Sequence, residues 1–335
     1  MHTEEPSIDE QFRLVKESGV FDYFDRLPRP DQLNEYARCS AKYDLPIHTV
    51  TWYYLLGRDE PLIEQNLDIG KEVGADVHNI MIFARHADGY VLGDDAIVDI
   101  YLRCYDAAAR RGMQPSFELH VNMWNEDFRR VSNVANAVRS RGIPFNFTLD
   151  YSHVIFKIEN PAEQDISGIR HDVASGRLVL DPFEPGNLCE QWLSLGIVLW
   201  AQLRPAAPNG PRNIWAKDES GNVGRGIQYP FFRPKPGEWH SEWNAYKVEP
   251  SKEAIRKILN HHLREPQSRL RYVTTEMINL PDYGMGAKYS LIEHNIACAR
   301  WIRDTWEELV AREEFASESI GMGIVDERYS KARST

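Results

Sequence analysis

The sequence has few cysteines, and they are not grouped. Its four cysteines are far apart in 335 residues and form no Cys-x-x-Cys pair. This excludes a disulfide-rich secreted domain and a cysteine-based structural zinc site. The opening stretch MHTEEPSIDEQF is acidic and polar, without the basic and apolar regions of a secretory signal. We therefore expect reduced, mostly structural thiols in a cytoplasmic protein.

Positive charge and long apolar runs are also scarce. Lys and Arg total 39 against 50 Asp and Glu, which gives a formal net charge of −11. This balance argues against nucleic acid or an anionic membrane as a partner, because both attract basic surfaces. No apolar run approaches the roughly 18 residues that suggest a membrane span. No Gly-x-Gly-x-x-Gly string follows a predicted strand, so no nucleotide cofactor is expected.

What the sequence does contain is a regular alternation of short apolar runs and amphipathic stretches. The apolar runs predict strands over 19–24, 45–54, 77–85, 115–121, 145–150, 196–205, 226–232 and 270–278. Between them, apolar residues recur at spacings of three and four, as in helices. Parallel strands buried on both faces need such helical crossovers. Eight strand–helix units predict a single α/β domain, a (β/α)8 TIM barrel over residues 1–315.

Two long connections and a polar tail interrupt this alternation. The segments at about 157–190 and 205–250 are longer than plain crossovers, and the second is rich in Pro, Gly and Trp. Enlarged loops at the C-terminal face of a barrel usually carry a substrate pocket or a subunit contact. A closing helix is predicted over 288–314. Residues 316–335 are predicted to be a tail that either reaches a partner or is loosely held.

Polar residues stand at the C-terminal ends of four predicted strands. They are Glu118, Asp150, Gln202 and Glu276. Barrel strands alternate inward and outward, and their C-terminal ends meet at one mouth. Three carboxylates gathered there repel one another, and a divalent cation relieves that repulsion. All four residues would ligate through oxygen, which favours Mn²⁺, with Mg²⁺ or Co²⁺ as further candidates.

Such a site suits removal of a proton next to a sugar carbonyl. A divalent metal polarises the carbonyl and acidifies the neighbouring C–H bond. The candidate bases are Glu118, Glu276 and His120, which lies two residues after Glu118 and so shares its strand face. An unperturbed histidine, with a pKa of about 6.5, is suited to this work. An orienting role for His120 is the alternative.

Two more residues are expected to contact substrate at the same mouth. His153 follows Asp150 by three residues, and Arg204 follows Gln202 by two. Arg204 therefore shares the inward face of its strand and can clamp an oxyanion. An ion pair within the barrel is the alternative role for Arg204.

The order of these residues resembles that of the xylose isomerase-like TIM barrels. This superfamily of sugar isomerases and ketose 3-epimerases has a Glu, an Asp-x-x-His string and a second Glu on strands four, five and eight. The resemblance covers about residues 19–314. It implies that Glu118, Asp150 and Glu276 are metal ligands. It also implies that His153 contacts the substrate or a metal-bound water.

Strand six departs from the family pattern. The sugar epimerases usually have a metal-binding His there, whereas this chain has Gln202-Leu203-Arg204-Pro205. A Gln carbonyl oxygen can still ligate Mn²⁺. The departure preserves metal binding but weakens the match to an ordinary epimerase.

The fate of the intermediate after proton removal determines the reaction. Reprotonation on the other face gives epimerisation, reprotonation at the adjacent carbon gives isomerisation, and a leaving group at the β carbon gives elimination. The last outcome is that of the C-glycoside deglycosidases, whose α-subunits are barrels of this superfamily that pair with a small β-subunit. The chain resembles them in length, in aromatic content, in the enlarged loop after strand six and in Gln202. We expect Trp215 and Tyr229 of that loop to stack on an aryl aglycone or to pack against a second subunit.

The sequence therefore supports three hypotheses. The first is a lyase-type α-subunit of a hetero-oligomer that cleaves the C–C bond of a 3-oxo aryl C-glycoside. The second is a ketose 3-epimerase or aldose–ketose isomerase that acts on a free sugar or cyclitol as a homo-oligomer. The third is a non-catalytic barrel scaffold, which the intact carboxylates disfavour. A related apurinic endonuclease is rejected, because it requires a basic face and several metal-binding histidines.

Overall fold

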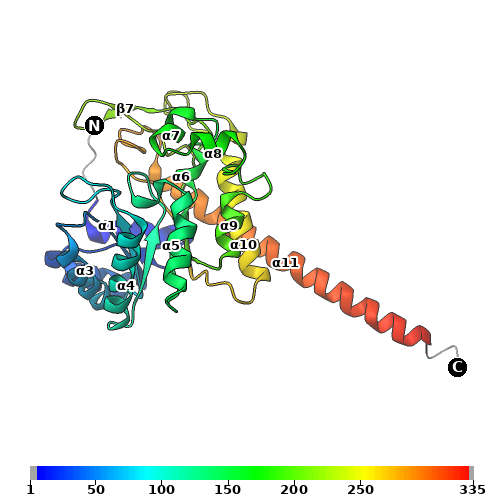
Figure 1. The fold of residues 1–335 in the computed structure, drawn as a ribbon. Coiled ribbons are helices and arrows are strands. Elements are labelled where there is room, and N and C mark those ends of the chain that lie inside the picture. Colours follow the sequence, from blue (N-terminus) through cyan, green and yellow to red (C-terminus); the bar gives the residue numbers. More distant parts are fainter. Residues whose placement is uncertain (1–5, 332–335) are drawn as a thin grey trace.

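A parallel sheet curled into a nearly closed barrel forms the centre of the protein (Figure 1). The computed structural model describes residues 6–331, with side chains described through residue 315. Seven strands lie in the order β1-β2-β3-β4-β5-β6-β9. They are β1 (Phe24–Asp25), β2 (Ile47–Tyr54), β3 (Val77–Ile82), β4 (Gln114–Glu118), β5 (Phe147–Asp150), β6 (Val198–Leu203) and β9 (Tyr272–Thr275). The predicted α/β TIM barrel is confirmed, with one strand fewer in the sheet than expected.

Helices surround the barrel. They are α1 (Ile8–Ser18), α2 (Leu33–Tyr43), α3 (Glu60–Glu72), α4 (Asp94–Ala109), α5 (Arg129–Arg139), α6 (Ser152–Ile155), α7 (Pro161–Ile166), α8 (Arg170–Ala174), α9 (Leu188–Ser194), α10 (Glu249–Arg264) and α11 (Leu291–Lys331), with 3-10 turns at η1 (Pro30–Gln32), η2 (Trp124–Glu126) and η3 (Ala245–Val248). In α5 the buried residues Val131, Val134, Ala135 and Val138 recur at spacings of three and four, which makes one apolar face. Within residues 6–331, no helix combines the length and apolar character needed to cross a lipid bilayer.

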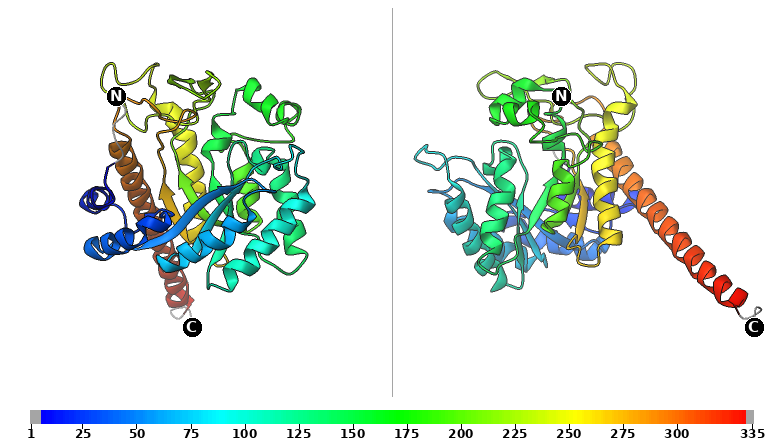
Figure 2. Two further views of the ribbon diagram at one scale, coloured as in Figure 1. Left: turned by 90° about the vertical axis from the view of Figure 1, so that its left-hand side faces the viewer. Right: turned by 45° about the vertical axis from the view of Figure 1, so that its right-hand side comes forward.

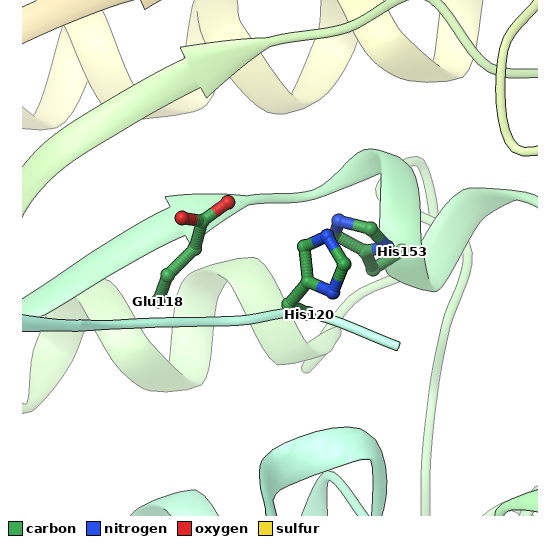
Figure 3. Close-up of side chains that lie close together, drawn as sticks. All are labelled: Glu118, His120 and His153. Atoms are coloured by element: carbon green, nitrogen blue, oxygen red, sulfur yellow. The ribbon is translucent and has the colours of Figure 1, made fainter. Parts of the chain in front are cut away.

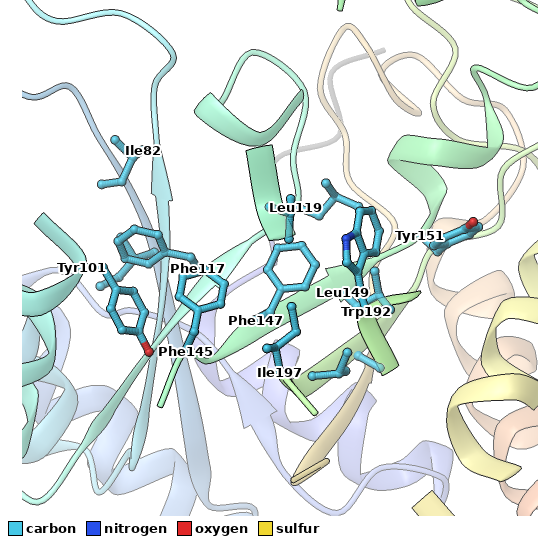
Figure 4. Close-up of a cluster of buried hydrophobic side chains, with 14 of the residues drawn as sticks. Ile82, Tyr101, Phe117, Leu119, Phe145, Phe147, Leu149, Tyr151, Trp192 and Ile197 are labelled. Carbon is cyan, nitrogen blue, oxygen red and sulfur yellow. The ribbon is translucent and has the colours of Figure 1, made fainter. Parts of the chain in front are cut away.

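The apolar core lies between the strands and the helices (Figure 4). Outward-facing Phe147 of β5 packs edge-to-face on Trp192 of α9, with ring centroids 5.4 Å apart. Phe117 of β4 packs in the same way on Tyr101 of α4 at 4.9 Å. Edge-to-face contacts of this kind add to the stability gained from burial. All four cysteines are free thiols buried in the protein, in agreement with their predicted structural role.

The inner face of the barrel, by contrast, carries polar side chains that bond to one another. The hydroxyl oxygens of Ser116 on β4 and Thr148 on β5 lie 2.7 Å apart. On the other side, the indole Nε1 of Trp200 on β6 donates to Thr274 Oγ1 on β9 at 2.9 Å. Because side chains alternate along a strand, the residues two positions further along these strands face the same interior. The barrel mouth is therefore lined by strand-end residues of β4, β5, β6 and β9.

The predicted seventh strand, residues 226–232, is not a strand. Strand β6 pairs directly with β9, with Gln202 opposite Thr274. Two residues explain the difference: Gly226 has a positive φ of 81°, and Pro230 has no N–H to donate to a ladder. The segment instead packs against the loop after β6, where Tyr229 N donates to Pro205 O at 2.8 Å.

The long connections lie at the C-terminal end of the barrel. Helices α7 and α8 fall within 157–190, and a two-stranded antiparallel sheet of β7 (Asn213–Lys217) and β8 (Val223–Gly224) falls within 205–250. Figure 1 shows α6, α7, α8 and β7 at the same end of the molecule. Figure 2 shows α11 leaving the barrel and projecting away from it. Helix α11 thus extends the predicted closing helix to Lys331. Residues 332–335 lie outside the described part of the chain, and a separate tail after the barrel remains a prediction.

Strand β8 lies so close to the loop after β9 that Gly224 leaves no room for a side chain. A Cβ at Gly224 would lie 1.8 Å from the carbonyl oxygen of Pro281. We predict that Gly224→Ala lowers the free energy of unfolding by about 1–3 kcal/mol, because the two backbones must separate. Gly93→Ala is the control, since a Cβ there meets nothing within 4 Å. Urea unfolding checks both variants, and equal stability of the two would contradict the prediction.

Candidate metal and active site

Three carboxylates converge at the barrel mouth. Glu118 ends β4, Asp150 ends β5 and Glu276 directly follows β9. One oxygen from each lies within 4.8 Å of the others. Glu118 and Asp150 are buried, whereas the Glu276 side chain is 32% exposed and can be reached from outside. The structure thus brings together the three residues that the strand-end pattern selected.

Gln202 completes an oxygen-rich edge beside Asp150. The two residues are opposite each other in the pairing of β5 with β6. Among the described residues, Gln202 Oε1 has no hydrogen-bond partner, although this atom is buried. Buried polar atoms are rarely left without a partner unless an ion, a water or a ligand satisfies them. This donor set, all oxygen, fits a hard or intermediate divalent cation.

Arg204 supplies one positive charge to this cluster. Its Nη2 lies 3.1 Å from Asp150 Oδ2 and also forms an ion pair with Glu276 Oε2. Burial opposes the charged guanidinium, but Glu276 and Asp150 outweigh it and raise the pKa of Arg204. If all three carboxylates were ionised, the single arginine would leave an excess of two negative charges. A divalent cation would balance this excess.

Glu118 bears most of the remaining repulsion. Burial, followed by the charges of Glu276 and Asp150, raises the pKa of Glu118 well above its usual range. One hydrogen bond works the other way, from Asn79 Nδ2 to Glu118 Oε2 at 2.5 Å. Without a cation, Glu118 therefore takes up a proton more readily than an exposed glutamate does.

Two histidines lie next to the carboxylates (Figure 3). The rings of His120 and His153 have centroids 4.4 Å apart. His120 Nδ1 lies 2.7 Å from Val121 O and must donate to it, so Nε2 accepts from the Tyr283 hydroxyl at 2.8 Å. Both ring nitrogens of His120 are thereby engaged, which favours the orienting role over that of a base.

His153 is different, because its ring nitrogens are free to meet a ligand. It is buried, and in the described part of the chain neither ring nitrogen has a hydrogen-bond partner. Its Nε2 lies 3.4 Å from Asp150 Oδ2. Burial, with Arg204 close by, lowers the pKa of His153 well below its usual value. Burial, with His153 and Arg204 nearby, likewise lowers the pKa of His120 to about 3, so both rings are neutral near pH 7.

Three residues of this site were not predicted from the sequence. Asn79 faces inward from β3, and this polar residue in an otherwise apolar run could have been noticed from its spacing. Asp25 ends β1, and burial together with the charge of Glu276 raises its pKa to about 7. Tyr283 comes from the loop after β9, and its ring lies beneath the Arg204 guanidinium at 4.3 Å. No local pattern identifies Tyr283, because only the folded loop brings it to the mouth.

Trp215 and Tyr229 belong to a different cluster. Their rings pack edge-to-face on Trp239, at 5.7 and 5.5 Å. Tyr229 is only 1% exposed, and its hydroxyl accepts from Asn244 N and donates to Glu242 O. The structure thus uses Tyr229 to hold the loop after β6 together and does not bring it to the carboxylates. The sequence pattern could not separate this role from substrate stacking.

A buried ion network fixes the loops that carry the histidines. Lys157, which follows α6, has no exposed side-chain surface and donates to Glu126 Oε1 at 2.8 Å and to Ser167 Oγ at 2.7 Å. Arg225, which follows β8, donates through Nε to Glu163 Oε2 at 3.0 Å and pairs with Glu126 through Nη2. Burial opposes ionisation of Glu126, but Lys157 and Arg225 outweigh it and lower its pKa to about 2. The network therefore ties together the loops after β4, β5 and β8.

Comparison with known proteins supports the fold. No protein-family model matches the sequence, and no curated protein matches it. Among solved structures, the chain is similar to an L-ribulose 3-epimerase, with 10% identity over 94% of each chain and a TM-score of 0.56. It is similar to a 3-keto-D-glucoside 4-epimerase from E. coli, with 14% identity over 91% of this chain and 97% of the other and a TM-score of 0.50. It is also similar to the IOLI protein with a bound zinc atom, with 13% identity over 91% of this chain and 95% of the other and a TM-score of 0.51. At these identities the likeness shows the fold alone, that of a TIM barrel.

Removal of the buried lysine should test the ion network. We predict that Lys157→Met lowers the free energy of unfolding by about 3–5 kcal/mol, because it leaves buried carboxylates without their partner. Lys42→Met is the matched control, because Lys42 pairs with Asp9 at the surface and its loss should have little effect. Urea unfolding measures both. An unchanged stability of Lys157→Met would show that the network contributes nothing to the fold.

A cation should stabilise the protein through the carboxylates. We predict that Mn²⁺ at 100 times its Kd raises the free energy of unfolding by about 2.7 kcal/mol, as linkage requires. Asp150→Asn should abolish most of this gain, because it removes a ligand charge. Asp304→Asn, an exposed change on α11, should keep it. Differential scanning calorimetry with and without Mn²⁺ measures this gain in stability for each variant. A gain in Asp150→Asn equal to that of the wild type would contradict the role of Asp150 as a metal ligand.

Proposed function

We propose that this chain is a divalent-metal-dependent, sugar-converting enzyme of the isomerase or epimerase kind. It would remove a proton from the carbon next to a carbonyl. The convergence of Glu118, Asp150 and Glu276 beside the unsatisfied oxygen of Gln202 carries this proposal. The structural likeness to proteins described as L-ribulose 3-epimerase and 3-keto-D-glucoside 4-epimerase supports the same reaction class.

The metal would be held by Glu118, Asp150, Gln202 and Glu276. Oxygen donors favour Mn²⁺, with Mg²⁺ and Co²⁺ as further candidates. When bound, such a cation polarises a sugar carbonyl and makes the adjacent C–H bond more acidic. A purely structural scaffold would have no reason to keep this repulsive cluster buried.

Glu118 and Glu276 are the residues best placed to move the proton. They come from β4 and β9, yet their carboxylates lie within 4.8 Å of each other. A carbon between them could lose its proton to one carboxylate and receive a proton from the other, which inverts that centre. The raised pKa of Glu118 suits it to hold a proton, and the partial exposure of Glu276 suits it to meet substrate first.

Arg204 and His153 would stabilise the negative charge that develops on the substrate oxygen. In the described part of the chain, Nε and Nη1 of Arg204 have no hydrogen-bond partner, although both are buried. The ring nitrogens of His153 are free as well. Donors fixed in a dry site stabilise developing charge without further reorganisation. His120, engaged by Val121 and Tyr283, would orient its neighbours and keep His153 in place.

The more specific candidate is C–C bond cleavage of a 3-oxo aryl C-glycoside. The same proton abstraction would generate an enolate, whose electron pair forms a carbon–carbon double bond to the β carbon as the bond to the aryl group breaks. The aryl carbon keeps the bonding electrons and takes up the proton that was removed. The likeness to a protein that acts on a 3-keto-D-glucoside favours a 3-oxo sugar as the substrate class. The Gln on β6 in place of the usual His also favours this candidate. In that case we expect a small second subunit to be required, whereas an epimerase would act as a homo-oligomer.

Deuterium incorporation tests the shared chemistry. In D₂O with Mn²⁺, we predict that the wild-type protein exchanges the proton next to the carbonyl of a free ketose or of a 3-oxo aryl C-glucoside. Glu276→Gln and Glu118→Gln should lower this exchange by about 10²–10⁴-fold, because each removes a proton-transfer group. Glu219→Gln, an exposed change, is the control.

The products separate the two candidates. Deuterium at C3 of the ketose without cleavage of the glycoside supports an epimerase. Release of the aryl group, alone or with a co-encoded small subunit, supports the lyase. No exchange with any of the three metals, or full exchange in Glu276→Gln, would reject the proposed proton transfer.

A further inference from the structure

Two neighbouring aromatic rings at the end of β2 are exposed to solvent. Tyr53 is 47% exposed and Trp52 is 37% exposed. Their rings are stacked, with centroids 5.2 Å apart and planes within 6°. Phe83, which follows β3, meets the Tyr53 ring edge-on at 5.8 Å. Single exposed apolar residues are common, but a preformed stack with an open surface is not.

Tyr53 of this pair lies on the face of β2 that is directed towards the barrel interior. Thr51 faces the barrel interior, because Asn79 donates both to Thr51 Oγ1 and to the Glu118 carboxylate. Tyr53 lies two residues further along β2 and therefore shares this inner face, roughly 7 Å nearer the mouth. Tyr53 is paired with Met81 of β3, which lies two residues after Asn79, just as Tyr53 lies two residues after Thr51. The stack thus continues the wall of the site towards solvent.

Strand β2 extends beyond its pairing with β1 on this side. Strand β1 pairs with β2 only as far as Asp25 opposite Thr49, so the last residues of β2 have a strand neighbour on one side alone. In the described sheet, β1 and β9 stand at the two ends of the strand order and are not paired. Asp25, which ends β1, lies near the partly exposed Glu276, because the Glu276 charge acts on Asp25.

We propose that Trp52 and Tyr53 form a subsite for a second ring of the substrate. The inference rests on the proposed function and specifies it further: the substrate is a glycoside with an aryl group or a second sugar, and not a free monosaccharide. Both kinds of ring offer a flat apolar face that stacks on Tyr and Trp. Because the two protein rings already lie parallel, little ordering is needed when a third ring joins them. Asp25, near Glu276 at the end of β1, offers a carboxylate to a sugar hydroxyl.

Direct binding tests this subsite without turnover. The full-length, Mn²⁺-loaded protein is titrated by calorimetry with methyl β-D-glucoside, phenyl β-D-glucoside and cellobiose. We expect one two-ring probe to bind about tenfold more tightly than the methyl glucoside. Tyr53→Ala and Trp52→Ala should remove this difference. Tyr246→Ala, a change at a 68% exposed tyrosine on η3, should retain it.

The outcomes separate the ring types and the two hypotheses. Preference for the phenyl probe identifies an aryl group, and preference for cellobiose identifies a second sugar. The subsite is rejected if wild type shows no preference, or if both alanine variants keep it. It is also rejected if either variant changes the molecular mass in light scattering, because the pair is then a subunit contact. If the wild-type protein exchanges ketose protons but binds all three probes equally, the subsite alone is rejected. If it prefers a two-ring probe but exchanges no protons, the proposed function alone is rejected.

Discussion

Mutual repulsion of the carboxylates at the barrel mouth is the constraint on which the rest of the site depends. Glu118 and Asp150 are buried, and Glu276 lies within 4.8 Å of both. Arg204 balances part of this charge by pairing with Asp150 and Glu276. Glu118 receives an amide hydrogen bond from Asn79, but burial and the charges of Glu276 and Asp150 still raise its pKa. A fold that keeps such a cluster must gain something in return, and a bound cation is the partner that suits both the charge and the oxygen donors.

Residues around the carboxylate cluster hold its histidines and Arg204 in position. His120 is fixed through both ring nitrogens, by Val121 and by Tyr283. Tyr283 also supports the Arg204 guanidinium from below, so one loop after β9 contacts both a histidine and the arginine. Further out, the buried ion network of Lys157 ties together the loops after β4, β5 and β8. The site is therefore held together where its loops are joined by ion pairs, whereas the end of β2 has a strand neighbour on one side alone.

Much of the fold and of the candidate site could be predicted from local patterns. The ends of the apolar runs gave Glu118, Asp150 and Gln202, because strand alternation and the shared C-terminal edge are properties of the backbone. The same reasoning failed at 226–232, where an apolar run contains Gly226 and Pro230 and forms no ladder. It also failed for Tyr229, since an aromatic residue in a long loop looks the same whether it packs inside or faces substrate. Tyr283 was missed because its loop has no period from which its direction can be inferred.

The sequence by itself determined the barrel class, the strand ends and the oxygen-rich, negatively charged character of the site. These depend on periodicity and residue chemistry, which are written locally along the chain. Only the tertiary structure decided which charges meet, that Arg204 stands between two carboxylates, and that His120 is engaged while His153 is free. It also decided that Trp52 and Tyr53 of β2 are exposed, whereas Tyr229 of the loop after β6 is buried. Such choices depend on contacts between segments far apart in the sequence, and no local pattern encodes the direction in which a loop folds back.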